Sequence, residues 1–116
     1  MKNFVVGKYE DYEEYYVVAC YDSIDKAKNY IQKHAKDARD YEITVIREDN
    51  VLGKFSLIDV EKYTNEYDLA SFIINSFDRF MNEFPTHKMT EREHNEYMKC
   101  KGIVNTFNIL YQEDKS

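Results

Sequence analysis

The stretch YYVVACYDSIDKAKNYI, residues 15–31, decides the fold class because its hydrophobic period changes partway along. Residues 15–21 are mostly aromatic and β-branched, which favours a strand. Both faces of that strand are fairly apolar, so we expect it in the centre of a sheet. Ser23 can then cap a helix, because its side-chain oxygen can accept an N–H of the first turn. The helix is predicted to end between residues 37 and 40, and its apolar residues at helical spacing are Ile24, Ala27, Ile31 and Ala35.

Upstream of this stretch, residues 4–9 form another run of β-branched and aromatic residues. The charged residues 10–14 separate that run from residues 15–21. Two strands joined by a short polar link are most simply an antiparallel hairpin. We therefore expect the chain to begin with one hairpin and to continue directly into the predicted helix.

Downstream of the helix, residues 41–47 (YEITVIR) alternate between apolar and polar side chains, as in a strand with one buried face. Residues 48–50 are typical of a turn, and residues 54–60 alternate again. Gly53 favours a bulge or a left-handed conformation just before that last strand. These segments predict a second hairpin beside the first, and hence a four-stranded antiparallel sheet in ββαββ order.

From residue 64 the hydrophobic period changes to that of a helix. Thr64 and Asn65 are expected to cap this helix, which carries acidic residues in its first turn. Pro85 is expected to end it, because the residue before a proline leaves the helical region. The stripe is broad enough for a principal core helix and consists of Leu69, Phe72, Ile73, Ser76, Phe77, Phe80, Met81 and Phe84.

A last helix is predicted after Thr90, because Thr90 and Glu93 have the spacing of a capping box. Gly102 lies inside this helix, where glycine costs about 1 kcal/mol relative to alanine, and a close helix crossing would explain its presence. The expected architecture is thus α+β, with a four-stranded antiparallel sheet in ββαββ order followed by two C-terminal helices. We assign residues 1–116 to a single domain, with the sheet and its helix in residues 1–62 and the helical pair in residues 63–113.

The composition narrows the classes of partner. The chain has a formal net charge of −6, which disfavours direct binding to nucleic acid. No apolar stretch approaches membrane-spanning length, and that within residues 1–8 is too short for a signal peptide. We therefore expect a cytoplasmic protein without membrane contact, whose Cys20 and Cys100 are buried structural thiols.

The sequence carries no recognisable catalytic or cofactor motif. The histidines, His34, His87 and His94, and the two cysteines have no surroundings typical of nucleophilic catalysis. Glu91 and His94 are three residues apart, a spacing that is common by chance. The sequence has no CxxC or HxxxH pair of the kind that binds a metal. Three scattered glycines cannot form a phosphate-binding loop. We expect a protein that is not an enzyme and binds no metal or cofactor, with acid pairs among its 22 acidic residues left open.

The first candidate binding site is the tyrosine-rich acidic segment YEDYEEYY, residues 9–16, in which four of eight residues are acidic and four are tyrosine. Tyrosine beside carboxylates suits an arginine-rich partner, through cation–π and salt-bridge contacts. Spaced carboxylates can also imitate a phosphate backbone. An ordinary charged hairpin turn is the alternative. The predicted partner-binding residues are Glu10, Asp11, Tyr12, Glu13 and Glu14, with Tyr12 as an aromatic anchor.

The second candidate site is the connection between the two predicted C-terminal helices, residues 84–95. A helix N-terminus with arginine and lysine nearby can hold an anion such as a nucleotide phosphate. A capped connection without a ligand is the alternative. The predicted ligand-binding residues are Lys88, Arg92, His94 and Asn95, with Phe84 stacking on a base.

The N-terminal segment through residue 31 resembles a module common in small phage and prophage proteins. There, a strand hairpin leads into a helix that opens with Ser, then Lys-Ala, then Tyr-Ile, matched here by Ser23, Lys26, Ala27, Tyr30 and Ile31. The plan of a sheet followed by two helices is also similar to that of the Thoeris anti-defence proteins, which sequester a cyclic ADP-ribose signal. Small acidic phage proteins of this size are often inhibitors of host defence, such as anti-CRISPR proteins.

These resemblances imply a function, although no site residue carries over from either family. The leading expectation is a phage-encoded inhibitor in the host cell cytoplasm that binds a host defence protein stoichiometrically and occludes its basic, nucleic-acid-binding surface. The alternative is an oligomeric sponge for a cyclic-nucleotide or cyclic ADP-ribose signal. A structural or assembly protein is the third interpretation. Apolar stripes on two long helices also favour a homodimer or another homo-oligomer.

Overall fold

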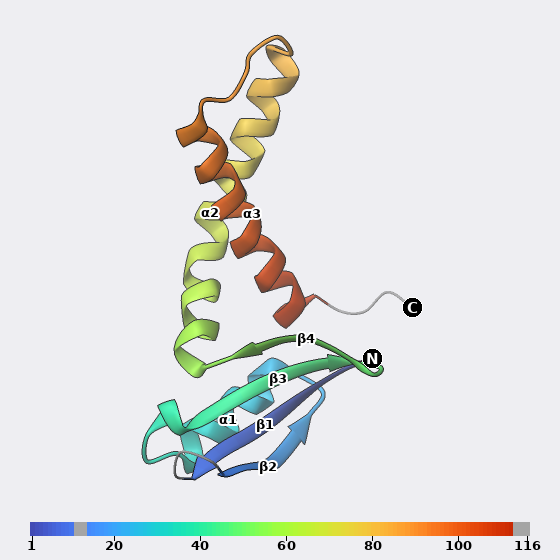
Figure 1. Cartoon of the computed structure of the whole chain (residues 1–116), viewed down its shortest axis with the longest axis vertical. Coiled ribbons are helices and arrows are strands. Elements are labelled where there is room, and N and C mark those ends of the chain that lie inside the picture. The colour runs from blue at the N-terminus through green and yellow to red at the C-terminus, as the bar shows by residue number, and fades with distance from the viewer. Residues whose placement is uncertain (11–13, 113–116) are drawn as a thin grey trace. The chain divides into compact units, whose positions relative to one another are not determined.

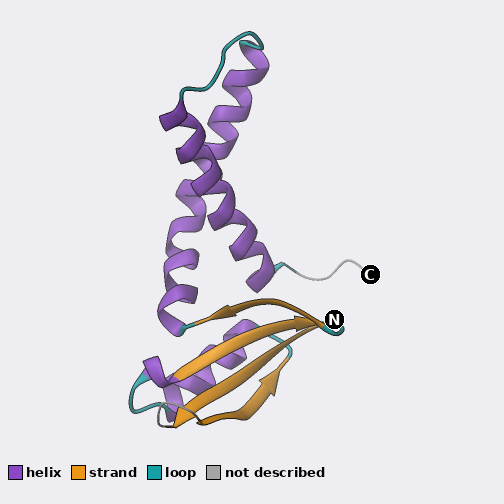
Figure 2. Ribbon diagram, viewed as in Figure 1, coloured by secondary structure: helices purple, strands orange, loops and turns teal. Residues whose placement is uncertain are grey.

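The structure is a computed structural model that describes residues 1–10 and 14–112 (Figure 1). Within those residues the chain forms an antiparallel sheet and three α-helices, which Figure 2 distinguishes by colour. In chain order the elements are β1 (Lys2–Glu10), β2 (Glu14–Tyr21), α1 (Ile24–His34), a 3-10 turn (Ala38–Asp40), β3 (Tyr41–Arg47), β4 (Asn50–Phe55), α2 (Leu57–Glu83) and α3 (Glu91–Tyr111). The predicted α+β class and the order ββαββ followed by two helices are confirmed.

The four strands are ordered β2-β1-β3-β4, and each neighbouring pair is antiparallel. The expectation that residues 15–21 form a central strand is wrong, because β2 lies at an edge of the sheet and Val17 within it is 63% exposed. The apolar character of both its faces reflects exposed aromatic and branched side chains rather than burial. Cys20 in this strand is exposed as well, so its predicted burial is wrong.

The core of the sheet lies on the face that α1 covers. Side chains alternate along a strand, and the register of β1 with β3 aligns their inward-facing residues in pairs. Ile24, Ala27 and Ile31 of α1 are buried against this face, as their helical spacing predicted. The buried residues on this face of the two central strands are Phe4, Val6, Ile43, Val45 and, at the strand ends, Lys2 and Tyr41.

The first helix begins where the sequence indicated but ends earlier. Ser23 Oγ accepts a backbone N–H of the first turn at 3.2 Å, so Ser23 is the helix cap. The helix stops at His34 rather than between residues 37 and 40. Asp37 explains the early end, because its carboxylate accepts the backbone N–H of Arg39 at 3.0 Å and starts the 3-10 turn.

The second hairpin turns at Glu48, whose φ of 54° lies in the left-handed region. The pairing of β3 with β4 shifts register between Val45 and Ile46, where Val45 is aligned with Gly53. The irregularity expected near Gly53 is therefore present, and it bends the strand that leads into α2.

The predicted strand over residues 54–60 is wrong for most of its length, because a helix cap interrupts it. Ser56 Oγ accepts the N–H of Asp59 at 3.1 Å, and Asp59 Oδ2 accepts the N–H of Ser56 at 3.3 Å. This reciprocal pair starts α2 at Leu57, so the helix start predicted at Thr64 is wrong too.

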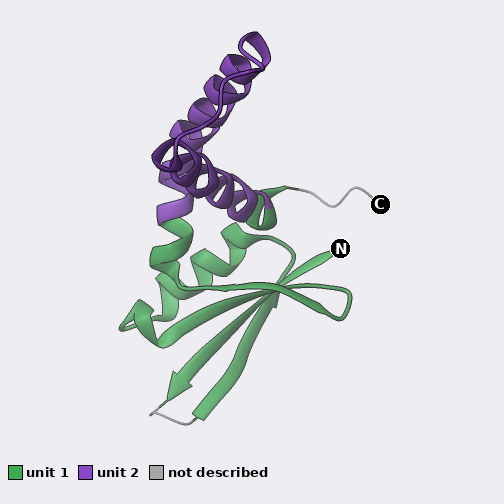
Figure 3. Cartoon of the chain, turned by 45° about the horizontal axis from the view of Figure 1, so that its top comes forward, with its two compact units in different colours: residues 1–61, 109–116 green, residues 62–108 purple. Residues whose placement is uncertain are grey.

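The chain divides into two compact units (Figure 3). The first contains residues 1–61 and the C-terminal residues from 109 onward, and so includes the whole sheet and α1. The second contains residues 62–108 and consists of the α2–α3 helical hairpin. No helix in the described part of the chain combines the length and the apolar character needed to cross a membrane.

Aromatic contacts hold the α2–α3 hairpin together. The Tyr67 ring stacks on Phe107 with the ring centroids 3.8 Å apart, and Phe77 meets Tyr97 edge-on at 5.9 Å. Cys100 of α3 is buried, as predicted, and this burial raises the pKa of its thiol. The hairpin thus buries the side of each helix that faces the other helix.

The connection from α2 to α3 follows the local sequence signals. α2 ends at Glu83, just before Pro85. Thr90 Oγ1 accepts the N–H of Glu93 at 3.1 Å and Glu93 Oε1 accepts the N–H of Thr90 at 3.0 Å, which confirms the predicted capping box. The close crossing expected at Gly102 is wrong, because a Cβ there would meet no described atom within 4 Å beyond its own helix backbone and chain neighbours.

Candidate functional site

The first candidate site lies at the end of the β1–β2 hairpin. Glu10 and Glu14 are aligned across the two strands, so the structure brings these two predicted residues together. Both side chains are exposed. The other three predicted residues, Asp11, Tyr12 and Glu13, lie outside the described residues.

Three tyrosines line the strands that lead to this acidic pair. Tyr9 and Tyr15 are aligned across the hairpin, with ring centroids 4.9 Å apart. Tyr16 Oη donates a hydrogen bond to Glu14 Oε2 at 2.9 Å, and Tyr9 Oη donates one to Glu42 Oε1 at 3.5 Å. We name this group the acidic tyrosine edge, and its described members are Tyr9, Glu10, Glu14, Tyr15, Tyr16 and Glu42.

Neighbouring carboxylates raise the pKa values of two of the tyrosines. The negative charge of Glu42 raises the pKa of Tyr9, and the carboxylate that Tyr16 binds raises the pKa of Tyr16. The Lys8 ammonium lies 3.3 Å from Glu10 Oε1, and this contact raises the pKa of Lys8. The edge therefore presents phenol rings beside three carboxylates, one of which is paired with a lysine.

Sequence reasoning missed Glu42, which comes from β3. It reaches the hairpin because β3 pairs with β1 and aligns Glu42 with Gly7. The alternation over residues 41–47 indicated that Glu42 lies on the polar face of its strand. No local sequence pattern, however, shows which strand pairs with β3. Tyr9, Tyr15 and Tyr16 lie within residues 9–16 but are not among the predicted contact residues.

The second candidate site is only partly assembled. A shallow depression on α3 brings together Arg92 and Asn95 of the predicted set. Phe84, Lys88 and His94 are exposed and are not among its lining residues. Two carboxylates share the depression with two cationic groups, so its charge does not favour an anion. The full lining consists of Thr90, Glu91, Arg92, Asn95, Glu96 and Lys99.

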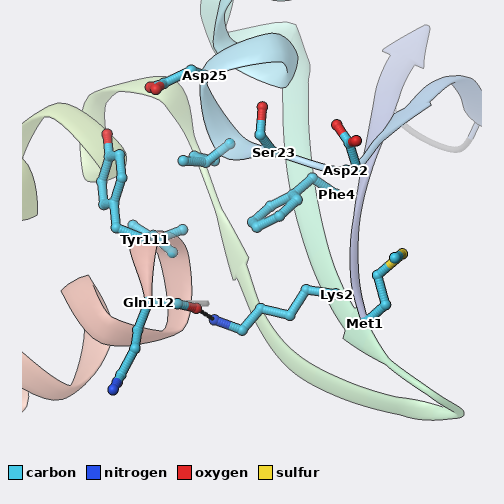
Figure 4. A pocket seen from close by; sticks show the side chains of 10 residues that line it. Met1, Lys2, Phe4, Asp22, Ser23, Asp25, Tyr111 and Gln112 are labelled. Atoms are coloured by element: carbon cyan, nitrogen blue, oxygen red, sulfur yellow. Dashed lines mark hydrogen bonds between the residues drawn. The ribbon is translucent and has the colours of Figure 1, made fainter. Parts of the chain in front are cut away.

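A hollow of about 550 Å³ in the first unit was not indicated by the sequence (Figure 4). Lys2 is only 7% exposed, and its ammonium donates hydrogen bonds to the backbone carbonyls of Ile109, at 2.8 Å, and Gln112. The start of β1 thereby caps the carbonyls at the C-terminal end of α3. The lining residues are Met1, Lys2, Phe4, Asp22, Ser23, Ile24, Asp25, Leu110, Tyr111 and Gln112.

Two charged groups in this hollow, those of Lys2 and Asp22, have partners within the protein. Lys2 binds the backbone carbonyls of Ile109 in α3 and of Gln112 directly after it, and Figure 4 shows the bond to Gln112. Asp22 accepts a hydrogen bond from Lys26 Nζ at 2.8 Å, and that bond lowers the pKa of Asp22. The hollow therefore serves to tie the first strand to the end of the last helix.

Across residues 1–10 and 14–112, no three or more His, Cys, Asp and Glu side chains gather as they would around a metal ion. Comparison of the chain with protein-family models, with curated proteins and with solved structures found no match. Within the described residues, the acidic tyrosine edge is therefore the strongest candidate site.

Proposed function

We propose that this protein is a phage-encoded, stoichiometric inhibitor that binds a basic surface of a bacterial immune effector through the acidic tyrosine edge. One observation carries the proposal: three exposed tyrosines and three carboxylates gather at the end of the hairpin, with Tyr9 hydrogen-bonded to Glu42 on one face of the sheet and Tyr16 to Glu14 on the other. Aromatic rings held in place by such bonds lose little freedom on binding.

The chemistry of this edge matches an arginine-rich partner. A guanidinium can bind the carboxylate of Glu42 through two parallel N–H bonds and can stack on the ring of Tyr15, which lies on the same face of the sheet. Tyrosines supply rigid contact area at protein interfaces. The net charge of −6 also speeds encounter with a positively charged surface.

Competitive occlusion is the mechanism that follows from this chemistry. Proteins that bind nucleic acid contact its phosphates mainly through lysine and arginine. Carboxylates held on a sheet edge can occupy the same groove, and the inhibitor then needs neither a catalytic group nor contact with the nucleic acid. The resemblance to small acidic phage proteins supports an immune effector as the target.

Phage plating on bacteria that each carry one immune system tests the proposal. We expect the protein to restore plaque formation against at least one system whose effector binds nucleic acid, and a Glu10→Lys/Glu14→Lys variant to lose this protection. The control variant Glu48→Lys/Asp49→Lys makes the same charge change in the β3–β4 turn, which carries no tyrosine, and should keep it. Protection by the first variant, or no protection in any strain, would contradict the proposal.

Calorimetry with cyclic ADP-ribose separates this proposal from the signal-sponge alternative. The proposal predicts no heat of binding when the ligand is titrated into the protein. Saturable heat that an Arg92→Ala variant loses would instead assign the ligand to the connection between α2 and α3, and would overturn the inhibitor mechanism.

A further inference from the structure

One side of α2 in the second unit is both apolar and exposed. Leu69 is 65% exposed, Phe72 68% and Phe80 40%, and Phe84, directly after the helix, is 52% exposed. With Ser76 these residues follow one another at intervals of three or four, so they share one face of the helix. We name this face the α2 stripe, and it consists of Leu69, Phe72, Ser76, Phe80 and Phe84.

The α2 stripe is apolar, as the buried centre of a protein interface is. The nine residues from Leu69 to Phe77, LASFIINSF, include no charged side chain, in a chain that is 33% charged. Ser76 is the polar member of the stripe, and its hydroxyl donates a hydrogen bond to the Phe72 carbonyl at 2.8 Å. If the stripe were buried, the Ser76 hydroxyl would therefore keep its hydrogen-bond partner.

The stripe lies beside the surface of α2 that α3 covers. Ala70 is buried, and Tyr67 and Phe77 make ring contacts with α3. A pair of helices buries only the sides that face each other, so apolar residues on a second side need a further partner. The stripe borders a shallow groove of about 330 Å³ that is lined by Phe72, Ile73, Ser76, Phe77, Phe80 and Glu93.

We propose that a second copy of this chain covers the α2 stripe and completes a four-helix bundle. The stripe is self-complementary in an antiparallel arrangement centred on Ser76. Phe72 and Phe80 are each four residues from Ser76, so Phe72 of one copy lies opposite Phe80 of the partner subunit. Leu69 then approaches Phe84 of the partner subunit, and the small Ser76 lets the two helices come close at the crossing.

The exposed area matches what a dimer of this kind needs. Taking about 200 Å² for a fully exposed phenylalanine, the stripe exposes about 400 Å² of apolar side chain per copy. A standard interface buries about 800 Å² per partner, of which about 56–65% is non-polar. The stripe therefore supplies roughly the apolar area of one stable, symmetric interface.

Charge argues against a lipid surface as the occupant. Acidic residues flank the stripe along α2 and at the start of α3, and the whole chain carries a net charge of −6. Anionic lipid headgroups attract lysine and arginine instead. The flanking acidic residues are Asp68, Glu83 and Glu93.

Light scattering after size-exclusion chromatography tests the dimer. The chain of 14.0 kDa should elute at twice that mass, and a Phe72→Glu variant should weaken the dimer by at least about 30-fold, as loss of a central interface aromatic does. The control variant Ile58→Glu makes the same change at another exposed position of α2, outside the second unit, and should leave the dimer intact. Circular dichroism should show equal helix content in both variants.

A monomeric mass for the unaltered chain would overturn the proposal, and so would a dimer that Phe72→Glu leaves unchanged. A disulfide test then fixes the geometry. In a Cys20→Ser background, oxidation of a Ser76→Cys variant should give a covalent dimer, whereas Asn75→Cys, which lies off the stripe, should not. Cross-linking by Asn75→Cys alone would contradict the antiparallel arrangement about Ser76.

The dimer goes beyond the proposed function and can fail independently of it. A dimer would carry two acidic tyrosine edges, and so could engage two copies of a target. Plating with the Phe72→Glu variant separates the two proposals, because loss of the dimer alone should leave a one-to-one inhibitor active.

Discussion

The Tyr15 ring lies directly against Gly7, in the space that a Cβ at position 7 would occupy. The two residues come from neighbouring strands, beside the register shift that follows Val6 in the β1–β2 pair. This contact holds the Tyr15 ring on the sheet next to Tyr9. A residue without a side chain thus positions a central member of the acidic tyrosine edge.

A Gly7→Ala substitution should therefore displace the Tyr15 ring. We expect it to destabilise the fold by about 1 kcal/mol, the low end of overpacking costs, because the atoms that must move lie at the far end of a half-exposed side chain. Urea unfolding of both single variants and of Gly7→Ala/Tyr15→Ala gives the coupling energy. An equal cost of Gly7→Ala with and without Tyr15 would show that the ring does not occupy this space.

At Gly102, substitution by alanine is expected to have the opposite effect on stability. A Cβ at this helical position would contact no described atom beyond its own helix backbone and chain neighbours, so Gly102→Ala should stabilise the protein by about 0.5–1 kcal/mol through helix propensity. Gly53→Ala is the contrasting variant, because its Cβ would lie 2.6 Å from the buried Phe55 ring, and it should destabilise. Thermal unfolding of both measures the difference. A loss of stability in Gly102→Ala would restore the close helix crossing rejected above.

The start of α2 at Leu57 predicts a cost for removing its cap. Ser56→Ala should destabilise the protein by about 1 kcal/mol, because one orphan N–H of the first turn loses its acceptor. Asn65→Ala is the matched control, since an exposed position inside the helix should accept alanine with no loss. If Asn65→Ala were the more costly of the two in chemical denaturation, the helix would begin near residue 64 after all.

The capping box of α3 predicts a dependence of stability on pH. The backbone N–H of Thr90 lowers the pKa of Glu93 below its ordinary value of 4.5, so the fold favours the ionised carboxylate. That stabilisation is present above about pH 4.5 and is lost as the pH falls through the lowered pKa, because the unfolded chain binds the proton first.

Thermal unfolding at neutral and at strongly acidic pH measures this contribution in a Glu93→Gln variant, which keeps an oxygen acceptor but has no charge. The unaltered chain should be the more stable at neutral pH, and the difference should shrink in acid. Glu91→Gln removes a charge from the same helical turn and serves as the control. The capping assignment would fail if both variants showed the same pH dependence.

Local patterns predicted the elements whose signals lie within a few residues. The cap at Ser23, the alternation over residues 41–47 and the Thr90–Glu93 box each act over one turn or one strand, and each is confirmed. The main error lies after β4, where an alternating pattern competes with a Ser-x-x-Asp cap. The helix prevails there because Leu57 and Val60, three residues apart, are both buried in helical geometry.

Strand order and site assembly depend on contacts between distant residues, which no local pattern encodes. The apolar faces of residues 15–21 suggested a central strand, but β3 occupies the other side of β1 and leaves β2 at the edge. The same pairing brings Glu42 to Tyr9. The pairing of Glu10 with Glu14 was predictable because only three residues separate them in the sequence.

The central claim is that the acidic tyrosine edge is the surface that binds a basic partner. Its most direct test is calorimetry with the purified effector from the system against which the protein protects. We expect saturable binding, and at least about tenfold weaker affinity, or about 1.4 kcal/mol, for Glu10→Lys/Glu14→Lys. The Glu48→Lys/Asp49→Lys control should bind as the unaltered protein does. Equal affinities for all three proteins would contradict the claim.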